Sequence, residues 1–434
     1  MYHTNVELST LTRFNEWWIS GHLRTELVKK YRRPSFARIL NYMDDRQIIL
    51  LYGLRRVGKT TLLYQIIDEL LSRGVEAKRI LYFSFDESDA EIDSVIEMYE
   101  TGILRSPIKS NGRVYIILDE VQKGRDWENR IKIYYDLHPG IKFIISGSAS
   151  LNVQKRSSET LAGRLYSFHI HPLDFSEFLT LKGINPEFEN WRMFEDSVKP
   201  LLMDYIVKGG FPELVNESSD EKILSYMKEI VLDRVVLIDI PLEFGVRDST
   251  LLKTLIEMVA SDPGFILNYD SLSNKLGRSR QTIMNYIFYL EYSLIIRTVK
   301  NMRPGFLSTS RKMRKVYFTN NAFQFAIRGL AYKDMGKIAE GAVMQAALPD
   351  NYYREGNEEI DFLLNQDGKL VPIEVKYGAG EVNKFSHLLR KLGFSDGIMV
   401  SGDEYKMYEK DGVRVRVVPL WLFVLFHDRI AELR

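Results

Sequence analysis

The feature that most constrains the fold of this chain is a glycine-rich loop at residues 53–60. Gly53 and Gly58 enclose four residues, and Lys59 and Thr60 follow directly. An apolar run typical of a buried strand precedes the loop, and a helix-like sequence follows it. In this pattern the glycines let successive backbone N–H groups point at phosphate oxygens in front of a helix N-terminus. The sequence therefore predicts a phosphate-binding loop.

The loop predicts ATP and Mg²⁺ as cofactors. Lys59 is expected to reach the β and γ phosphates, and the hydroxyl group of Thr60 is expected to bind Mg²⁺. The residues expected to contact the nucleotide here are Gly53, Arg56, Val57, Gly58, Lys59, Thr60 and Thr61. The alternative, an ordinary glycine turn, is disfavoured by the strand–loop–helix context.

Composition limits the class of protein. A chain of 434 residues predicts two to four domains, and 45% hydrophobic with 27% charged residues is typical of a soluble globular protein. The absence of cysteine excludes disulfides, thiolate metal sites and a thiol nucleophile. The N-terminus lacks the layout of a signal peptide, and the late apolar run 419–426 is too short to cross a bilayer. We therefore expect a cytoplasmic protein without a membrane partner.

Strand-like runs alternate with amphipathic helices between residues 48 and 170. The runs are 47–51, 79–85, 114–118 and 142–146. Such alternation predicts an α/β fold in which a parallel sheet has helices on both faces. Beyond residue 173 the pattern turns helical, and the last hundred residues return to mixed strand and helix.

Two carboxylates end the run at 114–118 and supply the expected second half of a nucleotide site. Asp119 is expected to orient Mg²⁺, and Glu120 is expected to act as the general base on the attacking water. The alternative is a strand that simply ends in solvent.

Two further contacts with phosphate are predicted downstream. The run at 142–146 ends in small polar residues, so that Ser146 or Ser148 is a candidate sensor of the γ phosphate. The guanidinium group of Arg164 matches phosphate oxygens and is a candidate contact within its own subunit or with a neighbour's nucleotide. The alternatives are a plain turn for the serines and a surface or carboxylate-paired role for Arg164.

The motifs stand in an order that resembles one family. The matching segments are 55–63, 118–122, 146–148, 161–164, 172–173 with 177–179, and 209–213. Together they are similar to prokaryotic, especially archaeal, AAA-type ATPases with a C-terminal domain of unknown function. The resemblance implies N-terminal helices with a P-loop AAA+ ATPase core at 1–172, a helical lid at 173–240, a winged helix-turn-helix at 241–325 and a small α/β nuclease-like domain at 326–434.

Residues 268–287 resemble a helix-turn-helix, with 278–287 as the recognition helix. From Ser271 to Lys315, ten basic residues oppose a single acid, Glu291, in a chain of net charge +1. The basic residues are Lys275, Arg278, Arg280, Arg297, Lys300, Arg303, Arg311, Lys312, Arg314 and Lys315. This excess predicts binding of nucleic acid, DNA rather than RNA. The alternative is a winged helix that docks protein or joins copies of the chain into a homo-oligomer.

Four polar residues near the C-terminus have the pattern of a metal-dependent nuclease. Asp361 lies in a strand-like run, and Glu374 and Lys376 share one face of the next run. Asp361 and Glu374 are expected to hold Mg²⁺, and Lys376 is expected to position water or neutralise developing charge. Glu340, on a preceding helix, is expected to complete the metal shell. The alternative is an exposed strand with alternating charges.

This pattern is similar to the restriction-endonuclease-like PD-(D/E)xK superfamily, although Ile360 stands where that pattern has proline. Two functions follow. In the first, ATP hydrolysis gates a metal-dependent nuclease that acts on nucleic acid. In the second, ATP and ADP control which protein or nucleic acid the C-terminal half binds, without cleavage. A protein-remodelling motor is disfavoured because no segment resembles a substrate-threading loop.

Overall fold

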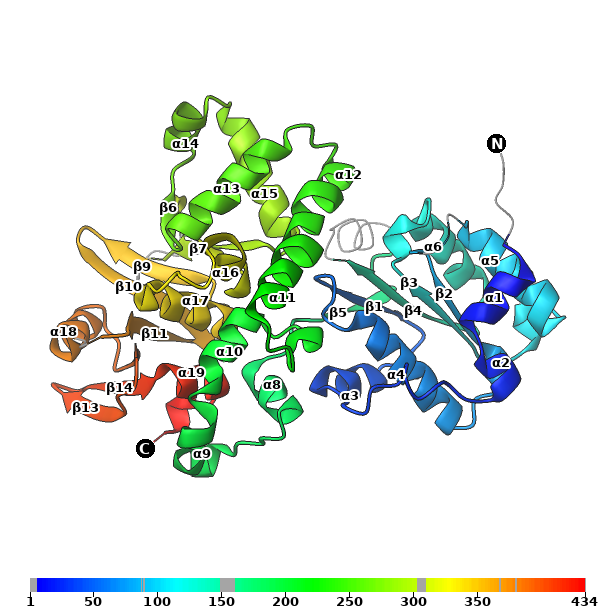
Figure 1. Cartoon of the computed structure of the whole chain (residues 1–434), viewed down its shortest axis with the longest axis horizontal. Coiled ribbons are helices and arrows are strands. Elements are labelled where there is room, and N and C mark those ends of the chain that lie inside the picture. Colours follow the sequence, from blue (N-terminus) through cyan, green and yellow to red (C-terminus); the bar gives the residue numbers. More distant parts are fainter. Residues whose placement is uncertain are drawn as a thin grey trace. The chain divides into compact units, whose positions relative to one another are not determined.

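The chain divides into two compact units, Met1–Pro172 and Leu173–Arg434 (Figure 1). We call them unit 1 and unit 2 and describe each by itself. The computed structural model describes residues 6–86, 88, 90–148, 161–302, 310–366, 368–378 and 381–433.

Unit 1 contains a parallel five-stranded sheet in the order β2-β3-β4-β1-β5. Its strands are β1 (Ile48–Gly53), β2 (Ile80–Ser84), β3 (Val114–Asp119), β4 (Ile141–Ser148) and β5 (Leu165–His169). The first four strands are buried along almost their whole length, as expected for a parallel sheet covered on both faces. The predicted α/β fold with a parallel sheet is confirmed.

Helices cover the two faces of this sheet. They are α1 (Leu8–Phe14), α2 (Trp17–Ser20), α3 (Pro34–Leu40), α4 (Lys59–Ser72), α5 (Ile92–Met98) and α6 (Trp127–Leu137). Single helical turns occur at Ala77–Arg79, Ile108–Ser110 and Val121–Lys123, and a wider π-helical segment at Tyr99–Leu104. Ile48 and Leu50 pack with Leu11, Val95 and Ile131 from α1, α5 and α6 in one core. Figure 1 shows α3 and α4 on the other side of the sheet from α5 and α6.

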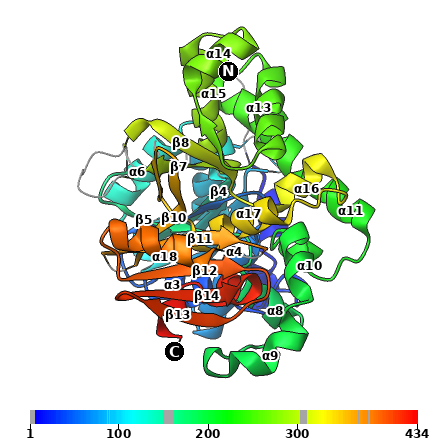
Figure 2. The same ribbon diagram turned by 90° about the vertical axis from the view of Figure 1, so that its left-hand side faces the viewer.

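Unit 2 contains a nine-stranded mixed sheet in the order β13-β14-β12-β11-β10-β9-β7-β8-β6. Its strands are β6 (Phe265–Leu267), β7 (Ile296–Asn301), β8 (Ser310–Phe318), β9 (Asn351–Glu355), β10 (Glu358–Gln366), β11 (Lys369–Lys376), β12 (Asp396–Ser401), β13 (Lys406–Lys410) and β14 (Val413–Pro419). Figure 2 shows this series from β8 and β7 at the top to β13 at the bottom. The predicted winged-helix and nuclease-like segments therefore share one sheet.

The helices of unit 2 precede, interrupt and follow the sheet. They are α8 (Phe175–Leu181), α9 (Trp191–Val198), α10 (Leu201–Lys208), α11 (Asp220–Ser225), α12 (Ile240–Phe244), α13 (Ser249–Ser261), α14 (Tyr269–Leu276), α15 (Arg280–Tyr292), α16 (Ala322–Arg328), α17 (Met335–Ala347), α18 (Val382–Lys391) and α19 (Leu420–Phe426). Single turns occur at Phe188–Asn190, Pro212–Leu214 and Ile430–Glu432, and wider π-helical segments at Tyr226–Leu232 and Val235–Asp239.

The helices of the predicted lid belong to unit 2. The buried side chain of Asn320, which follows β8, donates to the carbonyl oxygen of Gly209 at 2.7 Å. α10 and α11 both contact α16, and α8 contacts α19. The lid segment is thus packed on the same body as the nine-stranded sheet.

Local sequence explains the two helices of the predicted helix-turn-helix, α14 and α15. Asn268 accepts a hydrogen bond from the Ser271 N–H and so caps α14, and Ser279 caps α15 in the same way through Thr282. Between the helices, Gly277 has φ +61°, a left-handed conformation that glycine adopts at little cost. The element order α13-β6-α14-α15-β7-β8 gives three helices followed by a hairpin.

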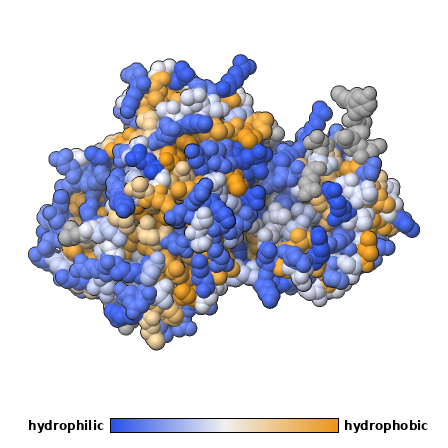
Figure 3. Space-filling view, in the orientation of Figure 1, coloured by the Kyte–Doolittle hydropathy of each residue, from blue (hydrophilic) through white to orange (hydrophobic). Residues whose placement is uncertain are grey.

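No helix in the described ranges is long and apolar enough to cross a membrane. The face shown in Figure 3 mixes hydrophilic and hydrophobic residues over both units.

Candidate functional site

The glycine loop of unit 1 lies between the end of β1 and the start of α4, as predicted. Gly58 has φ +98°, in the left-handed region that favours glycine. At Gly53 the reason for glycine is a close approach, because a Cβ atom there would lie 2.2 Å from the carbonyl oxygen of Ile170. Arg56 and Val57 lie in the loop. Both glycines are therefore required by local geometry.

Lys59 is the first residue of α4 and is only 5% exposed to solvent. Its Nζ atom donates to the carbonyl oxygens of Gly53 at 3.2 Å and Leu54 at 2.9 Å. The same atom lies 3.9 Å from Oε1 of Glu120. The predicted phosphate-binding cation therefore lies beside both the loop and the predicted general base.

Asp119, the last residue of β3, is the acceptor at the centre of the site. The Thr60 hydroxyl donates to its Oδ2 atom at 2.7 Å, and the Tyr82 hydroxyl donates to the same atom at 3.1 Å. The Ser146 hydroxyl and the Glu120 N–H donate to Oδ1. Burial and the charge of Asp119 hold the pKa of Tyr82 well above its usual value, so the phenol stays a donor.

The pair of Thr60 and Asp119 fits Mg²⁺. This ion binds in proteins through one or two oxygen side chains together with nucleotide phosphates and water. Here a hydroxyl from the first turn of α4 and a carboxylate from β3 are 2.7 Å apart, beside the phosphate loop. Thr61 follows in the same turn of α4.

Glu120 is held by a side chain that sequence reasoning missed. The Gln122 amide donates to Oε2 of Glu120 at 2.5 Å and to the Ser148 hydroxyl at 3.0 Å. The two candidate sensors thus differ in their partners, since Ser146 contacts Asp119 and Ser148 contacts Gln122. A glutamine two residues after Glu120 was the only sequence signal for this contact.

Arg164 does not reach the nucleotide loop of its own subunit, so the prediction of a contact within that subunit is wrong. The pairing of Ile48 with Leu165 places Arg164 beside the start of β1, whereas the loop follows the end of β1. Five residues of strand separate the two points by about 17 Å. Arg164 forms a two-bond ion pair with Asp136, at 3.0 and 3.2 Å. A contact with a neighbouring subunit stays a prediction.

Arg33 is a second missed residue. One nitrogen of its guanidinium group donates to the carbonyl oxygens of Val57 at 3.1 Å and His171 at 2.9 Å, and another donates to Pro172 at 3.2 Å. It therefore ties the phosphate loop to the last residues of unit 1. No local motif marks this contact, because Arg33 lies 24 residues before Val57 in the chain.

The four residues of the predicted nuclease site come together in unit 2. The antiparallel register of β10 and β11 pairs Phe362 with Ile373, which brings the preceding Asp361 near Glu374, and the Val375 N–H donates to Oδ2 of Asp361 at 2.9 Å. Lys376 lies 2.7 Å from Glu374. Glu340 approaches from α17, and its charge interacts with that of Asp361.

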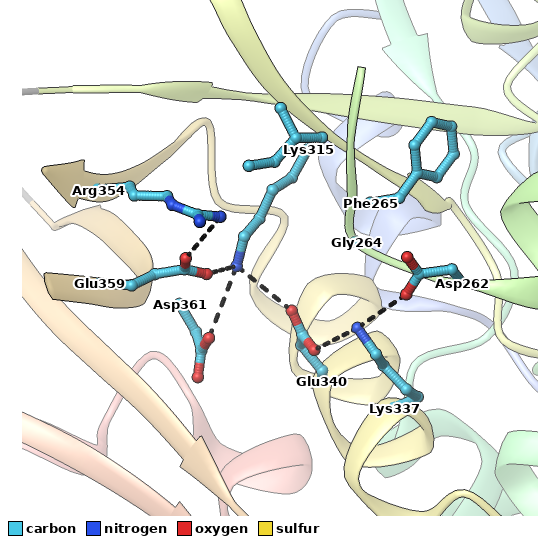
Figure 4. A pocket seen from close by; sticks show the side chains of 10 residues that line it. Asp262, Gly264, Phe265, Lys315, Lys337, Glu340, Arg354, Glu359 and Asp361 are labelled. Carbon is cyan, nitrogen blue, oxygen red and sulfur yellow. Dashed lines mark ion pairs between the residues drawn. The ribbon is translucent and has the colours of Figure 1, made fainter. Parts of the chain in front are cut away.

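A lysine that was predicted to lie on a basic surface occupies this cluster instead. Lys315, on β8, is only 4% exposed. Its Nζ atom lies 2.5 Å from Glu359, 3.6 Å from Glu340 and 3.6 Å from Asp361 (Figure 4). These residues line a pocket of about 420 Å³ together with Asp262, Gly264, Phe265, Ile266, Lys337 and Arg354. Lys315 is therefore not available to bind nucleic acid.

The expected metal shell of Glu340, Asp361 and Glu374 is not formed. Among the described residues, no group of three or more histidines or carboxylates is arranged to hold a metal ion. Burial, then the charge of Asp361, raises the pKa of Glu374 to about 7. The same two causes raise the pKa of Glu340. Both shifts have the same physical origin, which is burial of a carboxyl group beside a second carboxylate.

Acids from outside the predicted basic segment neutralise part of its charge. Arg278 pairs with Asp248 at 2.7 Å, Arg280 with Asp270 at 3.1 Å and Arg297 with Asp350 at 2.6 Å. Lys275 and Lys300 are exposed, and Arg314 is partly buried. Arg303 and the side chains of Arg311 and Lys312 lie outside the described part of the structure.

Comparison with known proteins covers most of the chain. The model of the AAA domain family matches residues 45–179, and two domains of unknown function, DUF8612 and DUF4143, match residues 199–334 and 335–423. The uncharacterized protein MJ1637 of Methanocaldococcus jannaschii is 30% identical, over 84% of this chain and 82% of its own. An uncharacterized protein of Haemophilus influenzae is 25% identical, over 90% of this chain and 98% of its own.

Among solved structures, a Walker-type ATPase of Pyrococcus abyssi, PABY2304, has a TM-score of 0.43 and 16% identity, and the match covers 71% of this chain and 99% of that one. The AAA domain match, together with the parallel sheet and its glycine loop, shows that unit 1 contains an AAA-like P-loop ATPase domain.

Proposed function

The chain belongs to the same family as protein MJ1637 of Methanocaldococcus jannaschii, and we propose that its unit 1 binds and hydrolyses ATP with Mg²⁺. One observation carries this proposal. The phosphate loop, the Thr60–Asp119 pair and the Lys59–Glu120 pair converge at the carboxyl ends of β1 and β3.

Each residue has a role that follows from its position. Lys59 and the loop N–H groups bind the β and γ phosphates and stabilise negative charge as the terminal phosphate leaves. Glu120 takes a proton from the attacking water, and Gln122 keeps its carboxylate in place. Thr60 and Asp119 would hold Mg²⁺, which would neutralise negative charge on the phosphates. The products are ADP and inorganic phosphate.

Purified Lys59→Ala and Glu120→Gln variants test this proposal. We expect Lys59→Ala to lose ATP affinity, and Glu120→Gln to bind ATP but to turn it over at least a hundredfold more slowly. Glu97→Gln, an exposed glutamate on α5, is the control and is expected to behave like the wild type. Unaltered ATP affinity and turnover in Lys59→Ala would overturn the proposal.

We further propose that unit 2 binds nucleic acid, DNA in preference to RNA, through a winged helix-turn-helix built on α15. The supporting observation is the exposed start of α15, where Arg280, Gln281 and Asn285 face outward. Guanidinium and amide side chains are the groups that read base edges in the major groove. The Arg280–Asp270 pair is exposed and therefore weak, so that Arg280 is free to exchange partners.

Binding measured at several salt concentrations tests this second proposal. We expect affinity for double-stranded DNA to fall steeply with salt, and the Arg280→Ala/Gln281→Ala variant to bind at least tenfold more weakly than wild type. Lys406→Ala, on the distant strand β13, is the control. Affinity that is independent of salt, or that is unchanged in the double variant, would favour protein docking. Repeating the measurement with ATP and ADP shows whether nucleotide controls binding.

Cleavage of nucleic acid by Asp361, Glu374 and Lys376 stays a prediction from the sequence and is not part of this proposal.

A further inference from the structure

We propose that the ammonium group of Lys315 is the resident cation of the acidic cluster in unit 2 and keeps divalent metal ions out of it. The acidic cluster consists of Glu340 on α17 with Glu359 and Asp361 on β10. The acidic cluster is separate from the proposed ATP site, because all the residues proposed to bind and hydrolyse ATP belong to unit 1.

The position of Lys315 depends on a bend in the sheet. Two strands, β7 and β9, separate β8 from β10, and in a flat sheet β8 and β10 would lie about 14 Å apart. Yet Lys315 on β8 contacts two residues of β10, and the rings of Tyr317 and Phe362 have centroids 5.5 Å apart. The junction of β7 and β9 is only two residue pairs long, which permits a sharp curve. The curvature brings the side chain of Lys315 across the concave face.

The carboxylates of the acidic cluster have all six oxygens engaged. Glu340 accepts from Tyr317 and pairs with Lys315 through one oxygen and with Lys337 through the other, at 3.8 Å. Glu359 pairs with Lys315 and, through its second oxygen, with Arg354 at 3.3 Å.

Asp361 pairs with Lys315 through Oδ1 and accepts the Val375 N–H through Oδ2. Figure 4 shows Lys315 at the point where the three carboxylates meet.

A divalent cation would have to displace these partners. Mg²⁺ requires about six oxygen ligands at about 2.1 Å, with their lone pairs directed at the ion. Lys315 Nζ already lies within 3.6 Å of all three carboxylates, so an added ion would be repelled at short range. Glu374 is different, because its Oε2 atom is buried and has no hydrogen-bond partner in the described structure. Glu374 does not belong to the acidic cluster, and its open oxygen is not among the contacts of Lys315.

Electrostatics keep the ammonium charged. Burial lowers the pKa of Lys315, but the carboxylates of Asp361, Glu340 and Glu359 outweigh it, and the net shift is upward. A buried, charged and fully paired lysine joins β8 of the hairpin to β10 and α17.

Equilibrium binding of Mn²⁺ to nucleotide-free protein, measured by calorimetry and by the paramagnetic resonance of free Mn²⁺, tests the inference. We expect the wild type and its Asp361→Asn variant to give the same weak binding. We expect Lys315→Ala to gain one site at least tenfold tighter, and the gain to disappear in Lys315→Ala/Asp361→Asn. Lys333→Ala, an exposed lysine just before α17, is the matched control and gains no site.

Two results would overturn the inference. One is a Mn²⁺ site in the wild type that is lost in Asp361→Asn, or cleavage of DNA or RNA in Mg²⁺ or Mn²⁺ that is lost in that variant. The other is a folded Lys315→Ala protein, judged by circular dichroism, that gains no site. If Lys315→Ala does not fold, the comparison of wild type with Asp361→Asn still decides, because it requires no change at Lys315.

Discussion

Asp119 and Glu120 are neighbours in sequence with different tasks, and the side chains around them explain the difference. Asp119 is buried and accepts from Thr60 and Tyr82, so that its position is determined by several donors. Glu120 has φ +52° and is held through Gln122. The side chain of Glu120 accepts one hydrogen bond, from Gln122, and lies 3.9 Å from Lys59, so it retains the freedom to accept a proton from water, which a general base requires.

Replacing Gln122 with Ala should slow ATP turnover without weakening ATP binding. The amide donates to Glu120 and to Ser148, and neither contact involves the phosphate loop at residues 53–60. We expect kcat to fall about tenfold, equivalent to ~1.4 kcal/mol. Single-turnover kinetics and equilibrium ATP binding separate the two quantities. Asn129→Ala, on the exposed face of α6, is the control, and an unchanged kcat in Gln122→Ala would contradict the positioning role.

The raised pKa of Glu374 predicts a dependence of stability on pH. Its folded pKa of about 7 exceeds the ordinary glutamate value, so its contribution to stability is fully present below about pH 4.5 and is lost as pH rises through 7. Glu374→Gln is neutral at every pH. We therefore expect this variant to be more stable than the wild type by about 2 kcal/mol at pH 8 and similar to it near pH 5.

Urea unfolding at the two pH values measures this difference. Glu381→Gln, whose side chain is 78% exposed, is the control. Equal stability of Glu374→Gln and the wild type at pH 8 would show that Glu374 is not strained by burial.

Among the elements, the strand–loop–helix of β1 and α4 is the most dependent on local geometry. Gly53 meets the backbone of Ile170, and Arg33 bonds Val57 to the segment after β5. The loop is therefore shaped by its own glycines and supported by a segment more than a hundred residues later.

Gly53→Ala should destabilise unit 1 and abolish ATP binding. The added Cβ atom would lie 2.2 Å from the backbone carbonyl oxygen of Ile170. A backbone atom cannot rotate away as the end of a flexible side chain can. We expect a loss of about 2–3 kcal/mol in the free energy of unfolding. Gly74→Ala is the matched control, since it has a positive φ but open space, and it should cost ~1 kcal/mol and leave ATP binding intact. Similar losses in both variants would contradict the steric explanation.

Elements with strong local sequence patterns were predicted well. The distant residues that their side chains contact were not. The strands of unit 1, the start of α4 and the turn at Gly277 follow from apolar runs, glycines and capping residues within a few positions of each other. The wrong prediction for Arg164 arose because a motif gives the distance along the chain, whereas parallel pairing decides which end of the sheet a residue occupies.

On the scale of the whole molecule, the two units have separate cores. The core of unit 1 is built on its parallel sheet, and a core of unit 2 includes Leu363, Phe385 and Val415 from β10, α18 and β14. Because each unit has a hydrophobic core of its own, we expect each to unfold as a cooperative body.

Calorimetry should show two unfolding transitions, only one of which responds to nucleotide. At an ATP concentration 100 times Kd, with Mg²⁺, we expect the free energy of unfolding of unit 1 to rise by about 2.7 kcal/mol. The unfolding transition of unit 2 should stay unchanged. Lys59→Ala should remove the gain. A single transition, or a shift of both transitions by ATP, would mean that the units unfold together.

The sequence by itself determined the phosphate loop, the Asp119–Glu120 pair, the parallel sheet and the location of the acidic residues in the chain. These depend on residues that are close in sequence, or on periodic patterns that hydrophobic burial imposes. Only the tertiary structure decided where Arg33, Arg164 and Lys315 lie. A count of charges placed Lys315 on a basic surface, but the curvature of the nine-stranded sheet carries it into the carboxylates of β10 and α17. Contacts of this kind depend on how strands distant in sequence bend and pair, which no local pattern specifies.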